Sequence, residues 1–422
     1  MTPDHNTYDS LDTRDPQKRE GDLMTRLSAQ VAHAQAHAPA FADLLRSVSA
    51  AAVNSRSALA QLPVIRKHEL LERQKAQRAT DVFGGFSAIG WGARHANRAL
   101  RVYASPGTIY EPEGRAADYW RMARALHAAG FRVGDLAHNC FSYHFTPAGL
   151  MMESGAHAVG CTVFPGGTGQ TEQQVQAMAE LKPTGYIGTP SFLKLILEKA
   201  TELGVSLPSL KKASVGGEAF PASLRDWLGE RGVNAYQSYG TADLGLIAYE
   251  TSAREGLVLD EGVIVEIVRP GTADPVAQGE VGEVVVTTLN PDYPLIRFGT
   301  GDLSAVLPGT CPTGRTNTRI KGWMGRADQT AKVRGMFVHP HQVAEIARRY
   351  PEVKKARLVV SGEMANDRMT LHVEVGGAAA GLDERIAESI RDVTKLRGEV
   401  LLCVPGSLPN DGKVIEDARR YD

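Results

Sequence analysis

Strand-like and helical runs alternate between about residue 100 and residue 300, and this alternation limits the folds open to the chain. Short runs rich in β-branched residues or bounded by glycine, at 186–189 (YIGT) and 212–217 (KASVGG), are typical of buried strands. Helical stretches occur between them at 172–181 (EQQVQAMAEL) and 190–203 (PSFLKLILEKATEL). Because parallel strands need helical crossovers, the pattern predicts an α/β domain with a largely parallel sheet.

The segments on either side differ in character. Residues 20–50 have the apolar spacing of one or two helices, and residues 257–306 contain short strands between Gly and Pro turns. We expect an α/β fold in which residues 1–327 form a large N-terminal α/β domain with a β subdomain. Residues 328–422 are expected to form a small, mobile C-terminal α+β domain, with the boundary near Asp328.

The composition excludes several functions. The formal net charge of the 422 residues is −1, so the basic excess of a nucleic-acid-binding protein is missing and we expect no nucleic-acid partner. The first fifteen residues are polar and acidic, unlike a signal peptide, and no apolar run reaches the ~18 residues of a membrane helix. Four scattered cysteines form no CxxC pair. We therefore expect a cytoplasmic protein that does not contact a membrane.

The first motif that carries chemistry is YGTAD, residues 239–243, which follows a strand-like run. The ring of Tyr239 can stack on adenine, and the backbone of Gly240 and Thr241 can approach a phosphate. Asp243 offers a carboxylate to Mg²⁺. Taken alone, such a segment is more often only a turn.

Two further motifs lie before and at the expected domain boundary. The run YPLIRFGTGD ends at Asp302, whose carboxylate can accept hydrogen bonds from both ribose hydroxyls, although a simple turn aspartate would look the same. The run GRAD, residues 325–328, is followed by Lys332 and Arg334. This stretch suggests a nucleotide-contacting strand and a hinge, and a solvated charged loop is the alternative.

The fourth motif, LPNDGK at residues 408–413, places a lysine after a turn glycine near the C-terminus. Lys413 can therefore reach an active site as a mobile cation, or it is an ordinary surface lysine. Each motif alone allows the ordinary structural interpretation. The four motifs in this order favour a nucleotide-dependent enzyme.

Together with these motifs, further segments make the chain resemble the phenylacetate–coenzyme A ligase family of the adenylate-forming enzyme superfamily. The resemblance runs nearly end to end. The additional segments that carry it are Tyr8-Asp9, LPVIRKH at 62–68, PGGTGQTE at 165–172, GTPS at 188–191 and GGE at 216–218.

The resemblance implies that ATP binds largely to the N-terminal domain. Asp302 and Arg326 would hold the ribose, and Asp243 would ligate Mg²⁺. The adenine and the phosphates would contact Ser105, Gly107, Thr108, Gly216, Gly217, Glu218, Tyr239, Gly240 and Thr241.

The resemblance also implies a C-terminal domain that rotates between two half-reactions, with Asp328 as the hinge. Lys413 would contact the substrate carboxylate and the α-phosphate during adenylation. After rotation, the thiol of coenzyme A would arrive through a channel lined by Lys332, Arg334 and Gly335.

The chain departs from the family's pattern at two places. The family's phosphate loop is rich in Ser, Thr and Gly and often carries a lysine, whereas residues 103–112 here read YASPGTIYEP. Pro106 lacks an N–H, and Ile109 and Tyr110 replace small or flexible residues, so we expect a poorer phosphate cradle. Asp243 stands where the superfamily usually has glutamate, and this shorter carboxylate still suits Mg²⁺.

An aromatic-rich segment, CFSYHFTP at residues 140–147, stands out in a chain with only 6% aromatic residues. Core packing would explain it as well as a binding role. The resemblance places the acyl or aryl pocket near here, with Phe141, Tyr143 and His144 as candidate walls.

We therefore expect an AMP-forming acid–thiol ligase. It would adenylate a small, aromatic carboxylic acid and transfer the acyl group to coenzyme A, using ATP and Mg²⁺. Two alternatives stay open: adenylation with a different acceptor, and a catalytically impaired homologue that binds a nucleotide or an acyl group. The sequence does not name the acid, and it leaves a homodimer open.

Overall fold

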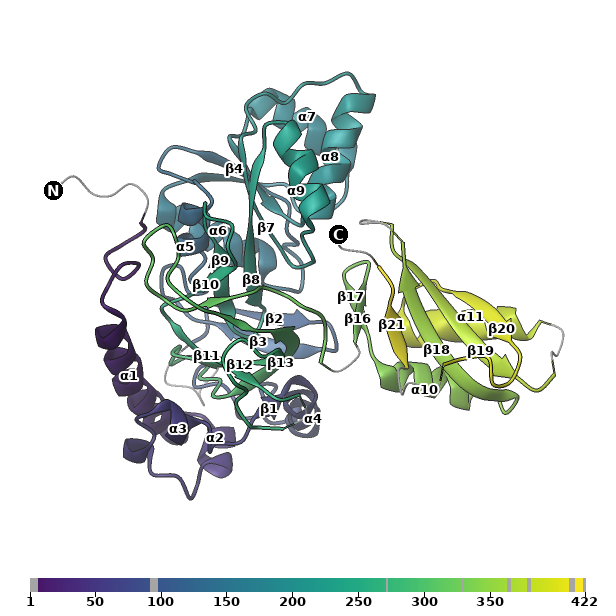
Figure 1. Cartoon of the computed structure of the whole chain (residues 1–422), viewed down its shortest axis with the longest axis horizontal. Coiled ribbons are helices and arrows are strands. Elements are labelled where there is room, and N and C mark those ends of the chain that lie inside the picture. The colour runs from purple at the N-terminus through teal and green to yellow at the C-terminus, as the bar shows by residue number, and fades with distance from the viewer. Residues whose placement is uncertain are drawn as a thin grey trace. The chain divides into compact units, whose positions relative to one another are not determined.

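The computed structural model describes residues 7–91, 98–270, 272–327, 330–362, 366–377, 381–409 and 414–419. The chain divides into two compact units, Met1–Gly325 and Arg326–Asp422 (Figure 1). The larger unit is α/β with an additional β sheet, and the smaller unit is α+β, which confirms the predicted fold class. None of the helices in the described ranges is long and apolar enough to span a bilayer.

The core of the N-terminal unit is a nine-stranded sheet of order β14-β15-β10-β9-β8-β7-β6-β4-β5. Strands β5, β4, β6, β7 and β8 run parallel, and the remaining strands are antiparallel. The bounds are β4 (Leu136–Asn139), β5 (Thr162–Pro165), β6 (Gly185–Gly188), β7 (Lys212–Gly216), β8 (Asn234–Thr241), β9 (Gly245–Glu250), β10 (Leu257–Leu259), β14 (Val306–Leu307) and β15 (Arg319–Ile320).

Helices cover both faces of this sheet. The chain steps from β4 outward to β5 and then returns past β4 to β6, so the crossover direction reverses between β4 and β6. Because such crossovers are right-handed, the helices before and after the reversal lie on opposite faces (Figure 1). One face carries α5 (Ala123–Ala128) and α6 (Ala148–Val159), and the other carries α7 (Thr171–Leu181), α8 (Pro190–Glu202) and α9 (Ala222–Glu230).

A second, four-stranded sheet of order β1-β13-β12-β11 forms the β subdomain. Arg297, inside the second sequence motif, is fully buried beside it. Its guanidinium pairs with Glu266 at 3.0 Å and donates to the carbonyls of Ala60, Leu62 and Ala273. Arg297 therefore has a structural role. The strands are β1 (Ile65–Arg66), β11 (Val263–Val268), β12 (Gly282–Thr288) and β13 (Phe298–Ser304), and a separate hairpin contains β2 (Arg101–Ser105) and β3 (Ile109–Glu113).

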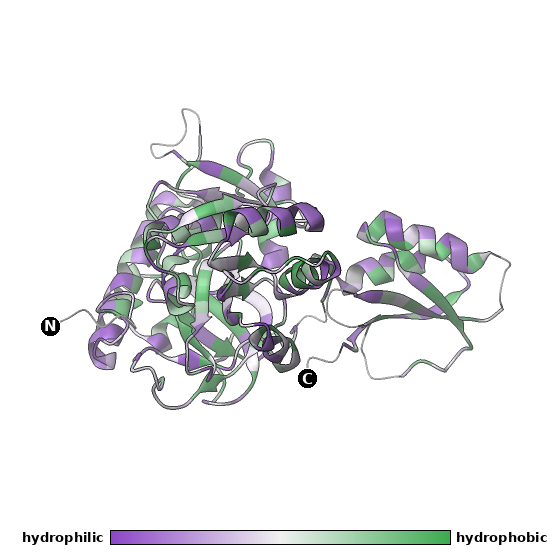
Figure 2. Ribbon diagram, turned by 90° about the horizontal axis from the view of Figure 1, so that it is seen from above, coloured by the Kyte–Doolittle hydropathy of each residue, from purple (hydrophilic) through white to green (hydrophobic). Residues whose placement is uncertain are grey.

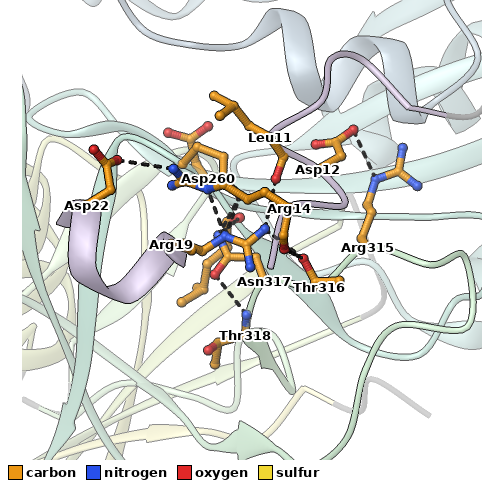
Figure 3. A network of polar contacts seen from close by, with 12 residues as sticks. Leu11, Asp12, Arg14, Arg19, Asp22, Asp260, Arg315, Thr316, Asn317 and Thr318 are labelled. Atoms are coloured by element: carbon orange, nitrogen blue, oxygen red, sulfur yellow. Dashed lines mark hydrogen bonds and ion pairs between the residues drawn. The ribbon is translucent and has the colours of Figure 1, made fainter. Parts of the chain in front are cut away.

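The N-terminal segment is tied to the sheets by buried charges. Helix α1 (Pro16–His37) starts at a proline, and the carboxylate of Asp15 caps it by accepting from two backbone N–H groups. Arg19 on its first turn pairs with Glu261 at 3.0 Å, and Arg315 reaches Asp12 at 3.6 Å (Figure 3). Such a network fixes the path of residues 7–15. The other helices of this region are α2 (Pro39–Leu44), η1 (Ala50–Ala52), α3 (Arg56–Leu59) and α4 (Lys67–Gln77).

The C-terminal unit has its own core beneath a sheet of order β20-β19-β18-β21. Its two helices carry hydrophilic and hydrophobic residues in alternation (Figure 2), because one side of each helix packs on the sheet. The elements are β16 (Ala331–Val333), β17 (Met336–Val338), α10 (Pro340–Arg348), β18 (Val353–Ser361), β19 (Arg368–Val375), α11 (Leu382–Thr394), β20 (Glu399–Cys403) and β21 (Ile415–Asp417).

Candidate active site

The reversal between β4 and β6 marks the place where an open parallel sheet binds ligands. Loops that leave the carboxyl ends of two such strands turn to opposite faces and open a crevice between them. The segment after β4 contains Phe141 and Tyr143, which are half-buried, and His144, which is exposed. The Tyr143 hydroxyl accepts from Asn139 at 2.8 Å and donates to Glu153 at 2.9 Å, so its ring is held in place. These residues thus stand at the edge where a substrate pocket is expected.

The glycine pair at the end of β7 lies on the same edge. A Cβ on Gly216 would meet the Ser238 carbonyl oxygen at 2.8 Å, so only glycine fits between β7 and β8. Gly217 has φ +79° and is exposed. Glu218 accepts a 2.7 Å hydrogen bond from the backbone N–H of Ser191, in the first turn of α8. Two of the segments that carry the family resemblance, GGE and GTPS, are therefore neighbours in space.

Asp302 is held by two side chains from different parts of the chain. The Tyr239 hydroxyl donates to Asp302 Oδ2 at 2.8 Å, and the Trp323 indole N–H donates to Oδ1 at 3.1 Å. Asp302 remains half-buried, and each carboxylate oxygen has a second lone pair. The arrangement fixes the carboxylate in one orientation.

The expected phosphate loop is the turn of the β2–β3 hairpin. Pro106 and Gly107 occupy its centre, Gly107 has φ +96°, and the Thr108 N–H donates to the Ser105 carbonyl at 3.0 Å. A proline followed by a glycine with positive φ is typical of a type II turn. The Thr108 N–H is thus used within the turn, and the Ser105 side chain is buried. Of the three residues predicted to contact phosphate, Gly107 and Thr108 lie at the exposed tip.

Asp243 lies in the short turn that joins β8 to β9, following Gly240 and Thr241. Its side chain is almost fully buried, and Oδ2 accepts from the Lys67 ammonium group at 2.9 Å. Among the described residues, Oδ1 has no hydrogen-bond partner. A lysine from the start of α4 is therefore brought next to the first motif.

Glu111 on β3 is a second carboxyl group in this place. It is completely buried, and neither of its oxygens makes a hydrogen bond of normal geometry within the described part of the chain. Burial and the charge of Asp243 raise the pKa of Glu111 well above its usual value, while Lys67 and Ser105 offset part of this effect. Burial also raises the pKa of the nearby Tyr293 hydroxyl, together with the charges of Asp243 and Glu111.

The residues present suit a divalent cation. Asp243 and Glu111 are close enough to interact, and both have buried oxygens without a hydrogen-bond partner among the described residues. Mg²⁺ prefers such hard oxygen ligands. It is typically bound by one or two carboxylates, with water and substrate phosphates completing its shell.

Three of the predicted channel residues belong to the C-terminal unit. Lys332 is on β16, and Arg334 and Gly335 form the β16–β17 turn with φ +48° and +83°. The Arg334 N–H donates to Asp367 at 2.9 Å. Arg326 also belongs to this unit, and its guanidinium lies over the Phe337 ring at 5.5 Å. The predicted hinge Asp328 and the predicted catalytic Lys413 lie outside the described residues.

Sequence reasoning missed three residues of the site: Lys67, Glu111 and Trp323. Lys67 stands inside the segment 62–68 that carries the resemblance, and that position was the available signal. Glu111 lies in the segment 103–112, and the sequence of that segment signals only the absence of a lysine. Trp323 gives no signal in the sequence, because a tryptophan in a loop is compatible with many packing arrangements.

Comparisons with known proteins identify the relatives of this chain. The family model of the AMP-binding enzymes matches residues 116–290. The phenylacetate–coenzyme A ligase of Thermus thermophilus is 32% identical over 347 residues, 73% of this chain and 78% of that protein. The enzyme of that name from Aromatoleum evansii is 28% identical and covers 90% of this chain and 89% of its own.

Among solved structures, 2-hydroxyisobutyryl-CoA ligase in complex with 2-HIB-AMP and CoA has a TM-score of 0.82 at 24% identity, over 97% of this chain and 92% of that one. This likeness shows the fold, and the family model together with the relatives shows that the chain is an adenylate-forming enzyme. Within that class, the identity and coverage of the relatives show that this chain belongs to the phenylacetate–coenzyme A ligase family.

Proposed function

We propose that this protein is an AMP-forming acyl–coenzyme A ligase for a small aromatic carboxylic acid. The carboxylate oxygen attacks the α-phosphorus of ATP, giving an acyl-adenylate and releasing pyrophosphate. The thiol of coenzyme A then attacks the acyl carbon, and AMP leaves as the thioester forms. The observation that carries this proposal is the Tyr239–Asp302–Trp323 cluster beside Asp243 in a chain of this family, because it offers a ribose site next to a carboxylate pair.

The N-terminal unit supplies the nucleotide site. Asp302 accepts hydrogen bonds from the ribose hydroxyls, and Tyr239 and Trp323 hold its carboxylate in position. Gly216 and Gly217 lie beside the adenine in this proposal, as the resemblance implies. Asp243 and Glu111 would hold Mg²⁺, which would offset the negative charge of the phosphates. Lys67 stands beside them as the fixed cation of the site.

The C-terminal unit supplies the mobile groups. Lys413 neutralises charge that develops between the acid and the α-phosphate, and rotation about Asp328 removes it after adenylation. The turn at Arg334 and Gly335, with Lys332 beside it, then lines the path of coenzyme A. These three roles rest on the resemblance of the sequence to the family.

In this proposal the acid binds at the carboxyl ends of β4 and β6, where the crossover direction reverses. Phe141 and Tyr143 offer aromatic walls there, and the two curated relatives named above are ligases of phenylacetate. An aromatic acid is therefore the substrate class that these walls favour. ATP and coenzyme A as substrates also fit a cytoplasmic location.

A second candidate function is favoured by one observation, the phosphate loop. The Pro106–Gly107 turn uses the Thr108 N–H internally, so this donor is not available to a phosphate. This feature weakens the hold on a triphosphate, as in a catalytically impaired homologue that binds an acyl group or a nucleotide. Adenylation with a different acceptor stays as the other alternative.

Exchange of labelled pyrophosphate into ATP, measured with a panel of aromatic acids, tests the proposal. Acid-dependent exchange is expected with at least one acid, and no exchange with any acid would support the impaired homologue. Product formation is then followed with and without coenzyme A. Thioester that forms only with coenzyme A supports the ligase, and exchange without thioester points to a different acceptor.

A further inference from the structure

A cavity of about 510 Å³ lies at the amino ends of the parallel strands, on the sheet edge opposite the candidate active site. Lys212 and Asn234, which begin β7 and β8, are direct partners in the sheet and both line the cavity. Gly216 and Thr241 end the same two strands at the other edge. The cavity is therefore separate from the nucleotide site and lies entirely within the N-terminal unit.

The lining of this cavity is strongly basic. Arg132, Lys211, Lys212 and Arg315 all contribute to it, and no Asp or Glu is among its lining residues. The chain as a whole has a net charge of −1, so the composition does not explain four cations around one cavity. Its volume falls within the ~300–1,000 Å³ range of small-molecule sites.

Nearby carboxylates neutralise only part of this charge. Lys212 pairs with Asp135 at 2.7 Å, and Arg315 approaches Asp12 at 3.6 Å through Nε (Figure 3). Asp12 is shared with Arg124, which also pairs with it. Lys211 is exposed and has no carboxylate partner in the described part of the chain. Its backbone is fixed on both sides, because its N–H and its carbonyl bond to Thr184 and Asn234.

His127, at the end of α5, also lines the cavity, and the cations around it affect its pKa. Burial lowers its pKa to about 4, and the charges of Arg132 and Arg315 add to this effect. Its Nδ1 is buried and has no hydrogen-bond partner among the described residues. Burial and the charge of Arg315 likewise lower the pKa of Arg132, although Asp135 opposes this. The cations thus repel one another, and a bound anion would relieve the repulsion.

We propose that this cavity binds a phosphorylated small molecule at a site separate from the active site. Guanidinium and ammonium groups together match the charge and the hydrogen-bond acceptors of phosphate. Lys211 supplies the exposed cation at the entrance, and Arg132 and Arg315 supply charge deeper in the wall. The volume leaves room for a ligand larger than the phosphate group itself.

Calorimetric titration of the full chain with inorganic phosphate tests this site. The Lys211→Glu variant is expected to bind phosphate at least about tenfold more weakly, because it reverses an exposed charge at the entrance. The matched control is Lys18→Glu, which makes the same charge change on the exposed surface of α1. An equal loss in both variants would mean that phosphate responds only to overall charge, and it would overturn the proposal.

Four further measurements distinguish this site from others. A Lys67→Met variant should bind phosphate as the wild type does, and loss of binding there instead would place the ion in the active site. Coenzyme A should not compete with phosphate, since competition would make the cavity part of the reaction's own binding surface. Citrate, a polyanion without phosphate, should bind more weakly, and tighter binding through Lys211 would overturn the choice of phosphate.

Finally, phosphate should raise the pKa of His127 in an NMR titration, and an unchanged pKa would contradict binding in this cavity.

Discussion

The hydroxyl of Tyr239 donates a 2.8 Å hydrogen bond to Asp302, and this bond joins β8 of the nine-stranded sheet to β13 of the four-stranded sheet. The two residues come from different motifs, 63 positions apart. Tyr239 thereby presents its ring at the expected adenine site. Its hydroxyl also orients the carboxylate of Asp302, which is expected to hold the ribose. The relative position of the two sheets thus sets the geometry of the nucleotide site.

Replacing Asp302 by alanine should weaken ATP binding and leave the acid site intact. Charged hydrogen bonds contribute roughly 1.5–3 kcal/mol each, so the KM for ATP should rise at least ~10-fold. Steady-state kinetics with each substrate varied in turn would measure this effect. Tyr239→Phe is the matched variant, because it keeps the ring and removes the hydroxyl that bonds to Asp302 and Thr300. A rise in the KM of the acid would show that Asp302 is not at the ribose.

Replacing Lys413 by alanine should impair adenylation and spare thioester formation from a supplied acyl-adenylate. Loss of a group that stabilises transition-state charge typically costs roughly 10²–10³ in rate, or about 3–4 kcal/mol. Single-turnover assays of the two half-reactions would separate the effects. Equal losses in both would indicate general damage to the C-terminal unit and contradict the role assigned to Lys413.

The sequence predicted the regular elements well because their signals are local. The runs at 186–189 and 190–203 became β6 and α8 with ends shifted by one residue, since periodicity and flanking glycines act within a few positions. The pairing of Lys67 with Asp243 spans 176 positions, and no local pattern encodes it. Contacts between residues so far apart in the sequence depend on how whole helices and strands pack together.

Glu111→Gln should weaken binding of a divalent cation. Within the part of the chain that the structure describes, Asp243 and Glu111 both have buried carboxyl oxygens without hydrogen-bond partners, so each is expected to contribute a ligand. Mn²⁺ binding, followed by electron paramagnetic resonance in the presence of ATP, should weaken about tenfold or more. Asp243→Asn should have an effect of similar size. Unchanged Mn²⁺ affinity in Glu111→Gln would leave Asp243 as the sole protein ligand of the pair.

The free energy of unfolding should depend on pH through His127. Its pKa is lowered to about 4 in the folded chain from 6.5. Between these values the unfolded chain binds more protons, so this contribution to stability is complete above pH 6.5 and is lost as the pH falls towards 4. The difference corresponds to at most ~3 kcal/mol, and partial exposure of the ring reduces it to ~1–2 kcal/mol. Denaturant unfolding of the wild type and His127→Gln at about pH 7.5 and about pH 5 would reveal it. A wild type that loses no more stability than the variant on acidification would contradict the prediction.

The phosphate loop should make ATP bind little more tightly than AMP. The Thr108 N–H is used within the Pro106–Gly107 turn, and Tyr110 is tied to the buried side chain of Gln74 by bonds of 2.8 and 2.9 Å. The loop therefore has few free donors and carries no lysine, so its own groups do not favour a triphosphate over a monophosphate. Calorimetry should give dissociation constants for the two nucleotides within about tenfold of each other.

Restoring a Ser at Pro106 and a Gly at Tyr110 should raise the affinity for ATP more than the affinity for AMP. Pro106→Ser returns a backbone donor, and Tyr110→Gly removes a bulky side chain next to the turn while keeping the backbone groups that bond to Gln74. AMP lacks the β- and γ-phosphates and serves as the internal control. A wild-type preference for ATP of several hundredfold would show that other groups hold the pyrophosphate part of ATP, such as Lys67 or Arg78, whose guanidinium donates to the Thr108 carbonyl at 2.7 Å. In that case the Pro-Gly turn would shape the hairpin without setting the choice of nucleotide.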